Sequence, residues 1–162
     1  MIFEGAAVIL PGDDVDTDVM YPGAYLNVDD PAEMKQYLFE GYDPSLRDRL
    51  GPDTIIVTGW NFGLGSSREH VVQALKAWEV PALVGRSFAR IFRRNCVNLG
   101  LAIFEAPEAA GAAKPGLRIR IDTDAGEISV DGRTFAIPSP APLVEELQVA
   151  GGLVPWVKER VG

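Results

Sequence analysis

The sequence is poor in the side chains that bind soft metals. Among its 162 residues there is one cysteine, Cys96, and one histidine, His70. One cysteine cannot form a disulfide within the chain, and the two residues together cannot supply the ligands of a structural zinc site or of an iron–sulfur cluster. No metal site is therefore expected in this chain.

Long hydrophobic runs and an excess of positive charge are also lacking. Glycine, proline or charged residues interrupt the apolar segments at strand length, so no membrane span is predicted. The 15 lysine and arginine residues are outnumbered by 23 aspartate and glutamate residues, and the net charge of −8 disfavours a nucleic-acid partner. The first residues, Met-Ile-Phe-Glu-Gly, do not resemble a signal peptide, which predicts a cytoplasmic location.

The chain does have enough apolar residues for one core. A hydrophobic fraction of 47%, without a low-complexity linker or an internal repeat, predicts a single domain over 1–162. Strand and helix patterns alternate up to Pro107, and short alternating segments around 122–126 then predict a β-hairpin, so the fold class is α/β with an added β-ribbon. The expected strands are 6–10, 54–58, 82–85, 101–105, 117–121, 127–130 and 134–137. The expected helices are 31–39, 66–78, 88–96, 142–149 and 154–160.

Charge is concentrated in two segments. Residues 13–43 contain nine acidic side chains and the single cation Lys35, a composition typical of solvated surface. Residues 86–94 contain four arginines and no acid, and these arginines alternate with Phe88, Ile91 and Phe92. This second pattern predicts a helix with one buried face, whose arginines bind a carboxylate or another chain.

A glycine-rich turn after the strand 54–58 is the strongest sign of a binding site. In Gly63-Leu-Gly65-Ser-Ser-Arg-Glu-His70, Ser66 and Glu69 have the spacing of a helix-capping box. The pattern predicts that a helix begins at Ser66, and that its free N–H groups, two hydroxyls and the Arg68 guanidinium bind a carboxylate or phosphate. Arg68 stands where a dinucleotide-binding motif has its third glycine, and no P-loop lysine follows. The alternative is an ordinary capped helix after a tight turn.

Two further features have weaker functional interpretations. His70 would lie on a different helix face from Ser66, so a local serine–histidine pair is not expected and a structural role is favoured. Gly12-Asp-Asp-Val-Asp-Thr-Asp18 has carboxylates spaced as in a calcium loop, but it lacks the glycine and glutamate that an EF-hand requires. These acids either cap turns or, in the case of Asp18, face a site.

Three motifs together resemble one enzyme family. Gly12-Asp-Asp-Val-Asp-Thr-Asp18, Asn61-Phe-Gly-Leu-Gly-Ser-Ser-Arg-Glu-His70 and Ser87-Phe-Ala-Arg-Ile-Phe92 resemble the small subunits of aconitase-like hydro-lyases, above all the 3-isopropylmalate dehydratase branch. The resemblance covers nearly the whole chain and implies the swivelling β/β/α three-layer domain of that family. It also implies a separate large subunit, in a heterodimer or heterotetramer, that carries a [4Fe–4S] cluster, with no cofactor bound by this chain.

The resemblance also implies a reaction and assigns residues to it. Water would be removed from a small dicarboxylate hydroxy acid and added back, which interconverts 2- and 3-isopropylmalate in leucine biosynthesis. The cluster of the large subunit would act on the hydroxyl as a Lewis acid, while Ser66 would move the carbon-bound proton. Ser67 and Arg68 would bind the substrate carboxylate, and Asp18 would support the site.

The sequence departs from the family in one place and leaves the substrate arm open. Leu64 replaces the cysteine that this branch usually has between the two glycines, a cysteine that is not a cluster ligand. The loop that tunes specificity has Asn27 and Val28, with no arginine for a third carboxylate, so Val28 would face an alkyl group. The alternatives are a related methylmalate, dimethylmalate or homoaconitate hydro-lyase and, from another class, a free-standing anion-binding module.

Overall fold

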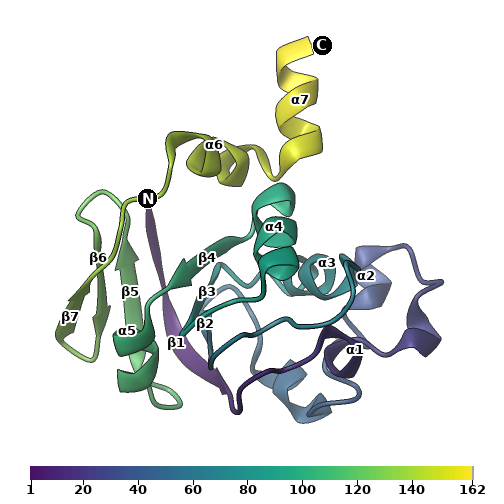
Figure 1. Cartoon of the computed structure of the whole chain (residues 1–162), viewed down its shortest axis with the longest axis horizontal. Coiled ribbons are helices and arrows are strands. Elements are labelled where there is room, and N and C mark those ends of the chain that lie inside the picture. The colour runs from purple at the N-terminus through teal and green to yellow at the C-terminus, as the bar shows by residue number, and fades with distance from the viewer. Residues whose placement is uncertain (162) are drawn as a thin grey trace.

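The computed structural model describes residues 1–161, which form one curled seven-stranded sheet (Figure 1). The strand order is β4-β3-β2-β1-β5-β6-β7. Neighbours from β4 to β1 are parallel, and neighbours from β1 to β7 are antiparallel. In chain order the strands are β1 (Ile2–Leu10), β2 (Thr54–Thr58), β3 (Ala82–Gly85), β4 (Ala102–Glu105), β5 (Arg118–Asp122), β6 (Glu127–Val130) and β7 (Arg133–Ala136).

The helices are short and most of them follow strands of the parallel half. In chain order the α-helices of the described residues are α1 (Thr17–Met20), α2 (Pro31–Met34), α3 (His70–Ala77), α4 (Arg90–Leu99), α5 (Pro107–Ala112), α6 (Pro142–Ala150) and α7 (Leu153–Val161). Two 3-10 helices, η1 (Gly23–Tyr25) and η2 (Pro44–Arg49), lie in the long connection between β1 and β2.

The parallel half of the sheet is covered on both faces, which gives three layers. Ile56 of β2 packs on the helix side in a cluster with Val72 of α3. Its neighbour Val57 points to the opposite face, as successive strand residues do, and packs in a cluster with Ile119 of β5 and Ile128 of β6. The antiparallel ribbon therefore curls over one face of the parallel strands while α2, α3 and α4 cover the other. This is the β/β/α arrangement expected from the sequence.

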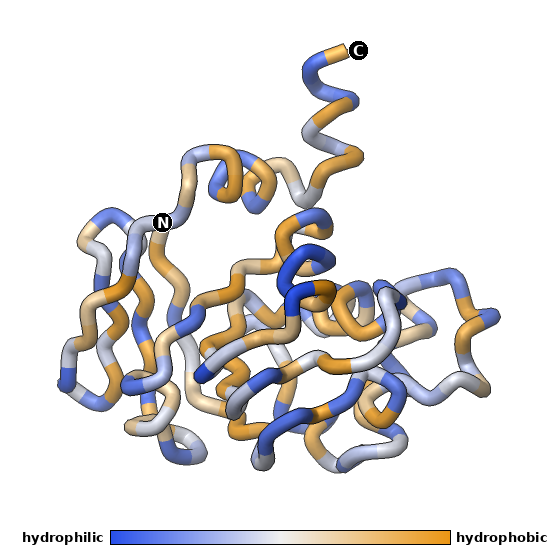
Figure 2. Tube along the Cα trace, viewed as in Figure 1, coloured by the Kyte–Doolittle hydropathy of each residue, from blue (hydrophilic) through white to orange (hydrophobic). Residues whose placement is uncertain are grey.

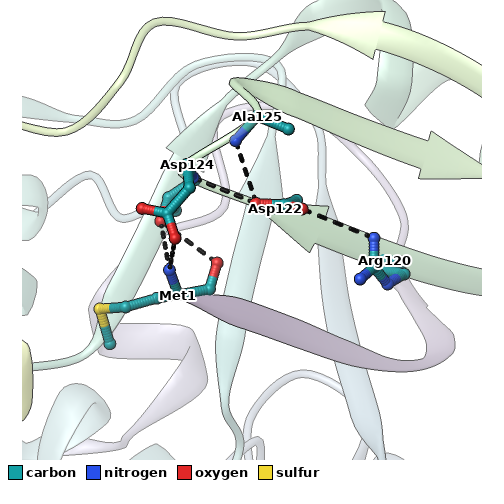
Figure 3. Close-up of polar contacts among 6 residues, drawn as sticks. Met1, Arg120, Asp122, Asp124 and Ala125 are labelled. Carbon is teal, nitrogen blue, oxygen red and sulfur yellow. Dashed lines mark hydrogen bonds and ion pairs between the residues drawn. The ribbon is translucent and has the colours of Figure 1, made fainter.

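The strands are predicted well from the sequence, and the hairpin after β5 is confirmed. The strands 54–58, 82–85 and 127–130 have the expected bounds, whereas β1 begins earlier because Ile2 pairs with Asp122 of β5. At the hairpin turn, the Asp122 carboxylate accepts hydrogen bonds from the N–H groups of Asp124 (3.1 Å) and Ala125 (3.0 Å) (Figure 3). The Met1 ammonium is 3.2 Å from the Asp124 carboxylate, which fixes the first strand to this turn.

The helix expected over 31–39 is wrong in length although its start is right. Asp30 caps α2 by accepting from the Ala32 N–H at 3.0 Å, and Pro31 occupies the first helical position. The α-helix ends at Met34, and the chain continues in turns. Phe39 has a φ of +66°, outside the helical region, and its side chain is fully buried. Burial of Phe39 in the core thus takes precedence over continuation of the helix.

The C-terminal helices lie at one end of the molecule. In Figure 1, α7 leads away from the rest of the chain, and Figure 2 shows hydrophobic positions along it. Its contact with α6 includes Glu146, whose carboxylate accepts from Trp156 Nε1 at 3.3 Å and from Arg160 at 3.4 Å. None of the helices within 1–161 has the length and hydrophobicity needed to cross a membrane.

Candidate active site

Three loops extend side by side beyond the carboxyl ends of the parallel strands. The first loop follows β1 and the second follows β2. In the second loop, Leu64 O accepts a hydrogen bond from the Thr17 N–H at the end of the first loop (2.7 Å), and the Gly63 N–H donates to Val15 O (2.9 Å). In the third loop, which follows β3, the Ala89 N–H donates to Phe62 O of the second loop (2.9 Å). The three sequence motifs, which are far apart in the chain, therefore meet at the edge where parallel sheets bind ligands.

The acidic loop 12–18 holds these loops together through its side chains. Asp13 accepts from the Trp60 N–H at 2.9 Å, and Asp14 accepts from the Asn61 amide at 3.0 Å. Asp16 caps α1 by accepting from the Asp18 N–H at 2.7 Å. The interpretation that these acids cap turns is confirmed for Asp16, while Asp13 and Asp14 connect the first loop to the second.

The expectation that a helix begins at Ser66 is wrong. Helix α3 begins at His70, with no side-chain cap from Glu69. Two interactions keep the preceding segment out of the helix: Leu64 pairs with Asp16 in a β-bridge, and Ser67 O accepts from the Asn95 amide at 3.1 Å. A helix would require that carbonyl for its own hydrogen bond four residues later. Ser66, Ser67 and Arg68 thus lie in a non-helical segment before α3, which we call the 66–68 segment.

The 66–68 segment still presents several donors for an anion. Within residues 1–161, the backbone N–H groups of Ser66, Ser67 and Arg68 donate no hydrogen bond. The side chain of Ser67 is exposed, and Arg68 is partly exposed. Three consecutive residues thus offer free N–H groups, a hydroxyl and a guanidinium, which together suit a carboxylate. These donors do not belong to a helix N-terminus, because α3 begins only at His70.

The Ser66 hydroxyl is buried without a hydrogen-bond partner in the described chain. The same is true of the Thr17 hydroxyl, and Thr17 is 4% exposed. A buried hydroxyl without a partner costs about 1–3 kcal/mol, so natural proteins keep one where it serves another purpose. Thr17 was not predicted as a site residue, because the carboxylates of its motif are the more conspicuous signal in the sequence.

Asp18 and Arg68 come together across 50 positions of sequence. Arg68 Nη1 lies 3.2 Å from Asp18 Oδ1, and the two side chains are 39% and 55% exposed. Because the pair is this open to water, it contributes little to stability. It does orient the guanidinium, whose remaining N–H groups are available for a ligand.

The loop with Asn27 and Val28 borders the same segment through His70. His70 Nε2 is 3.2 Å from Leu26 O, and the imidazole packs on the Tyr21 ring with centroids 5.0 Å apart. These contacts hold the imidazole in place, as the structural role favoured for His70 predicts, and its Nδ1 is buried without a hydrogen-bond partner in the described chain. Asn27 is exposed, whereas Val28 is partly buried against the helix-side core.

Gly65 is required by the close approach of the first loop, and a substitution tests this packing. Its φ is +110°, and a Cβ there would lie 2.6 Å from Asp16 Oδ1 and 2.8 Å from Thr17 Oγ1. We expect Gly65→Ala to lower the free energy of unfolding by about 2–4 kcal/mol in chemical denaturation, from backbone strain plus crowding.

The matched control for that substitution is Gly12→Ala. Gly12 has a similar φ of +95°, but a Cβ at this position would meet no atom within 4 Å. It should lose only about 1 kcal/mol, from backbone strain. Equal losses for the two variants would contradict the contact between Gly65 and the first loop.

Within residues 1–161, no set of side chains fits an iron–sulfur cluster or another metal centre. The described residues contain no group of three or more histidine, cysteine, aspartate or glutamate side chains able to hold a metal ion. Cys96 is fully buried, and burial raises the pKa of its thiol, which keeps it protonated. A protonated thiol inside the core is neither a ligand nor a nucleophile.

Thiol titration provides a direct check on Cys96. Native protein treated with a thiol-specific reagent should show almost no reaction, because only the thiolate attacks and Cys96 is 0% exposed. After unfolding in denaturant, one equivalent should react. Rapid reaction of the folded protein would show that the helix-side core opens around α4.

The 66–68 segment lies away from the larger cavities of the fold. A cavity of about 480 Å³ lies between Met1, α6 and α7, and another of about 440 Å³ lies between β1, Arg49 and the turn at Pro115 and Gly116. Neither is lined by Ser66, Ser67 or Arg68. A substrate held by this segment would therefore need a second wall.

Comparison with known proteins gives one consistent result. Residues 15–109 match the family model of the aconitase C-terminal domain. The 3-isopropylmalate dehydratase small subunits of Moorella thermoacetica and Thermodesulfovibrio yellowstonii are 47% and 42% identical over 93% of this chain, and over 92% and 90% of their own lengths. A crystal structure of 3-isopropylmalate dehydratase from Methanocaldococcus jannaschii is 40% identical, with a TM-score of 0.90, over 99% of this chain and 95% of that one.

Proposed function

This chain belongs to the family of 3-isopropylmalate dehydratase small subunits, and from that premise we propose that it supplies half of a hydro-lyase active site. The whole chain, 1–162, would act as one domain paired with a large subunit, in the cytoplasm, in leucine biosynthesis. The reaction would interconvert 2- and 3-isopropylmalate by dehydration and rehydration. The observation that carries the proposal is the contact of Arg68 with Asp18, two residues after Ser66, whose hydroxyl is buried without a partner within 1–161.

Arg68 and the segment around it would hold the substrate. One carboxylate of the hydroxy acid would accept from the Arg68 guanidinium, the Ser67 hydroxyl and the free N–H groups of the segment. Asp18 would fix the orientation of the guanidinium through their 3.2 Å contact. Asn27 and Val28 would lie near the substrate's alkyl arm, because His70 ties Leu26 to the start of α3, and the Val28 side chain would offer only the part that the helix-side core leaves uncovered.

Ser66 would move the proton. Its oxygen would take the carbon-bound proton as the hydroxyl leaves and the double bond forms, and would return a proton when water adds back. A serine needs positive charge nearby to act as a base, and Arg68 supplies it two residues away. Because the hydroxyl is buried in the chain alone, it must rotate toward the substrate in the working complex.

The [4Fe–4S] cluster would belong to the large subunit, since no residue set within 1–161 fits it. When bound there, the cluster supplies a Lewis acid for the substrate hydroxyl. The large subunit would also provide the second wall that this open segment needs. This division of residues predicts that the isolated chain has no activity.

Reconstitution with the large subunit from the same organism tests the proposal. The two subunits should combine anaerobically into a complex that converts isopropylmalate, followed by the absorbance of the unsaturated intermediate, while each subunit alone is inactive. Methylmalate, dimethylmalate and homoaconitate, tested in the same assay, show which side chain of the hydroxy acid the enzyme accepts. Activity of the isolated chain, or none of the pair on any of these acids, would contradict the proposal.

A further inference from the structure

The start of α4 carries positive charge where a helix tolerates it least. Arg90 occupies the first helical position, and Arg93 and Arg94 follow within the next turn, with no acidic residue in the first turn. The N-terminal end of a helix has a partial positive charge that disfavours cations. Like charges three and four positions apart also repel. Figure 2 shows hydrophilic positions alternating with hydrophobic ones along α4.

The fold neutralises only one of these three arginines. Arg93 lies 2.8 Å from the Glu105 carboxylate at the end of β4. Within residues 1–161, Arg90 and Arg94 form no ion pair, and both are exposed. Arg90 and Arg94, four positions apart, thus place two unpaired positive charges on one helix face of a chain whose net charge is −8.

This charged face lies close to the 66–68 segment. Asn95, next to Arg94, is 8% exposed and donates to Ser67 O at 3.1 Å. One turn earlier on the same face as Asn95, Ile91 is 41% exposed. On the surface of the helix Ile91 lies between the unpaired arginines and Asn95, and an exposed isoleucine beside arginines is a composition typical of an interface.

We infer that the Arg90, Ile91 and Arg94 face of α4 is where the large subunit docks, through an acidic surface with an apolar centre. This inference rests on the proposed function, because that function requires a second chain over Ser66–Arg68. A partner with carboxylates at this position would neutralise Arg90 and Arg94 and cover Ile91. The same partner would also lie next to residues 66–68, whose Ser67 carbonyl accepts from Asn95. Docking and substrate binding would then occur at adjoining surfaces.

Charge reversal at these positions tests the inference in the full reconstituted system. We expect R90E/R94E to weaken association with the cluster-bearing large subunit on the order of 100-fold, with a reduced dependence of the Kd on salt. The kcat at saturating large subunit should remain that of the wild type, since neither arginine contacts the reacting atoms. The control R49E/R133E makes the same change in net charge at exposed arginines of η2 and β7 and should bind within about threefold of wild type.

Thermal unfolding of the isolated chain separates docking from a structural role. Glutamate is favoured in a first helical turn, so R90E/R94E should have a Tm equal to or above that of the wild type. If the variant binds as tightly as wild type, or no more weakly than R49E/R133E, the docking face is elsewhere. Salt-sensitive self-association of the isolated wild-type chain that R90E/R94E abolishes would assign the face to a second copy instead. If the wild-type pair itself neither assembles nor turns over, it is the proposed function that fails.

Discussion

Ser66→Ala in the reconstituted complex is expected to reduce kcat by about 1,000-fold or more while the subunits still assemble. General-base catalysis contributes roughly 100- to 10,000-fold, and the neighbouring Ser67 hydroxyl is exposed rather than buried. The isolated variant should be as stable as wild type or more stable by about 1 kcal/mol, because it removes a buried hydroxyl that lacks a partner. Turnover is followed by alkene absorbance and stability by chemical denaturation.

Ser67→Ala is the matched control for that experiment. Ser67 is the next residue, its side chain is exposed, and its carbonyl rather than its hydroxyl is held by Asn95. Loss of its hydroxyl should raise KM with a smaller change in kcat, because it contacts a carboxylate that does not react. If Ser66→Ala retains near-normal kcat, or if the two variants behave alike, Ser66 is not the base.

Arg68→Lys is expected to lower kcat/KM by roughly 10- to 100-fold, mainly through KM. A hydrogen bond to a charged group contributes about 1.5–3 kcal/mol, and a lysine ammonium cannot reproduce the two parallel bonds of a guanidinium to a carboxylate. The Tm should stay unchanged, since the Asp18–Arg68 pair is 55% and 39% exposed and such pairs stabilise little. Steady-state kinetics on isopropylmalate measure the effect.

Arg118→Lys provides a control of the same chemistry away from the segment. Arg118 lies on β5, also pairs with an aspartate, Asp53 at 2.8 Å, and is similarly exposed at 54%. Its replacement should leave both kcat and KM unchanged. If Arg68→Lys and wild type have equal kinetic parameters, Arg68 does not bind the substrate. Its role is then limited to its contact with Asp18 of the first loop.

Much of the architecture is determined by the sequence alone. Continuous β-branched runs such as 54–58 are buried on both faces, and that pattern is local, so β2 and β3 have the expected bounds. The hairpin after β5 is equally local, because Asp122 and the residues after it form the turn by themselves. The site motifs are also contiguous, so the family resemblance could propose Ser66, Ser67, Arg68 and Asp18 as site residues without a structure.

What the tertiary structure alone decides is how those motifs are arranged. Locally, Ser66 and Glu69 match a capping box, but hydrogen bonds with residues far along the chain outweigh that preference: Thr17 binds Leu64 O, and Asn95 binds Ser67 O. The helix therefore begins late, at His70. The contact of Arg68 with Asp18 and the burial of the Ser66 hydroxyl arise in the same way. Local propensity is a sum over neighbours in sequence, whereas this edge of the sheet is built from contacts between distant segments, and only folding brings those together.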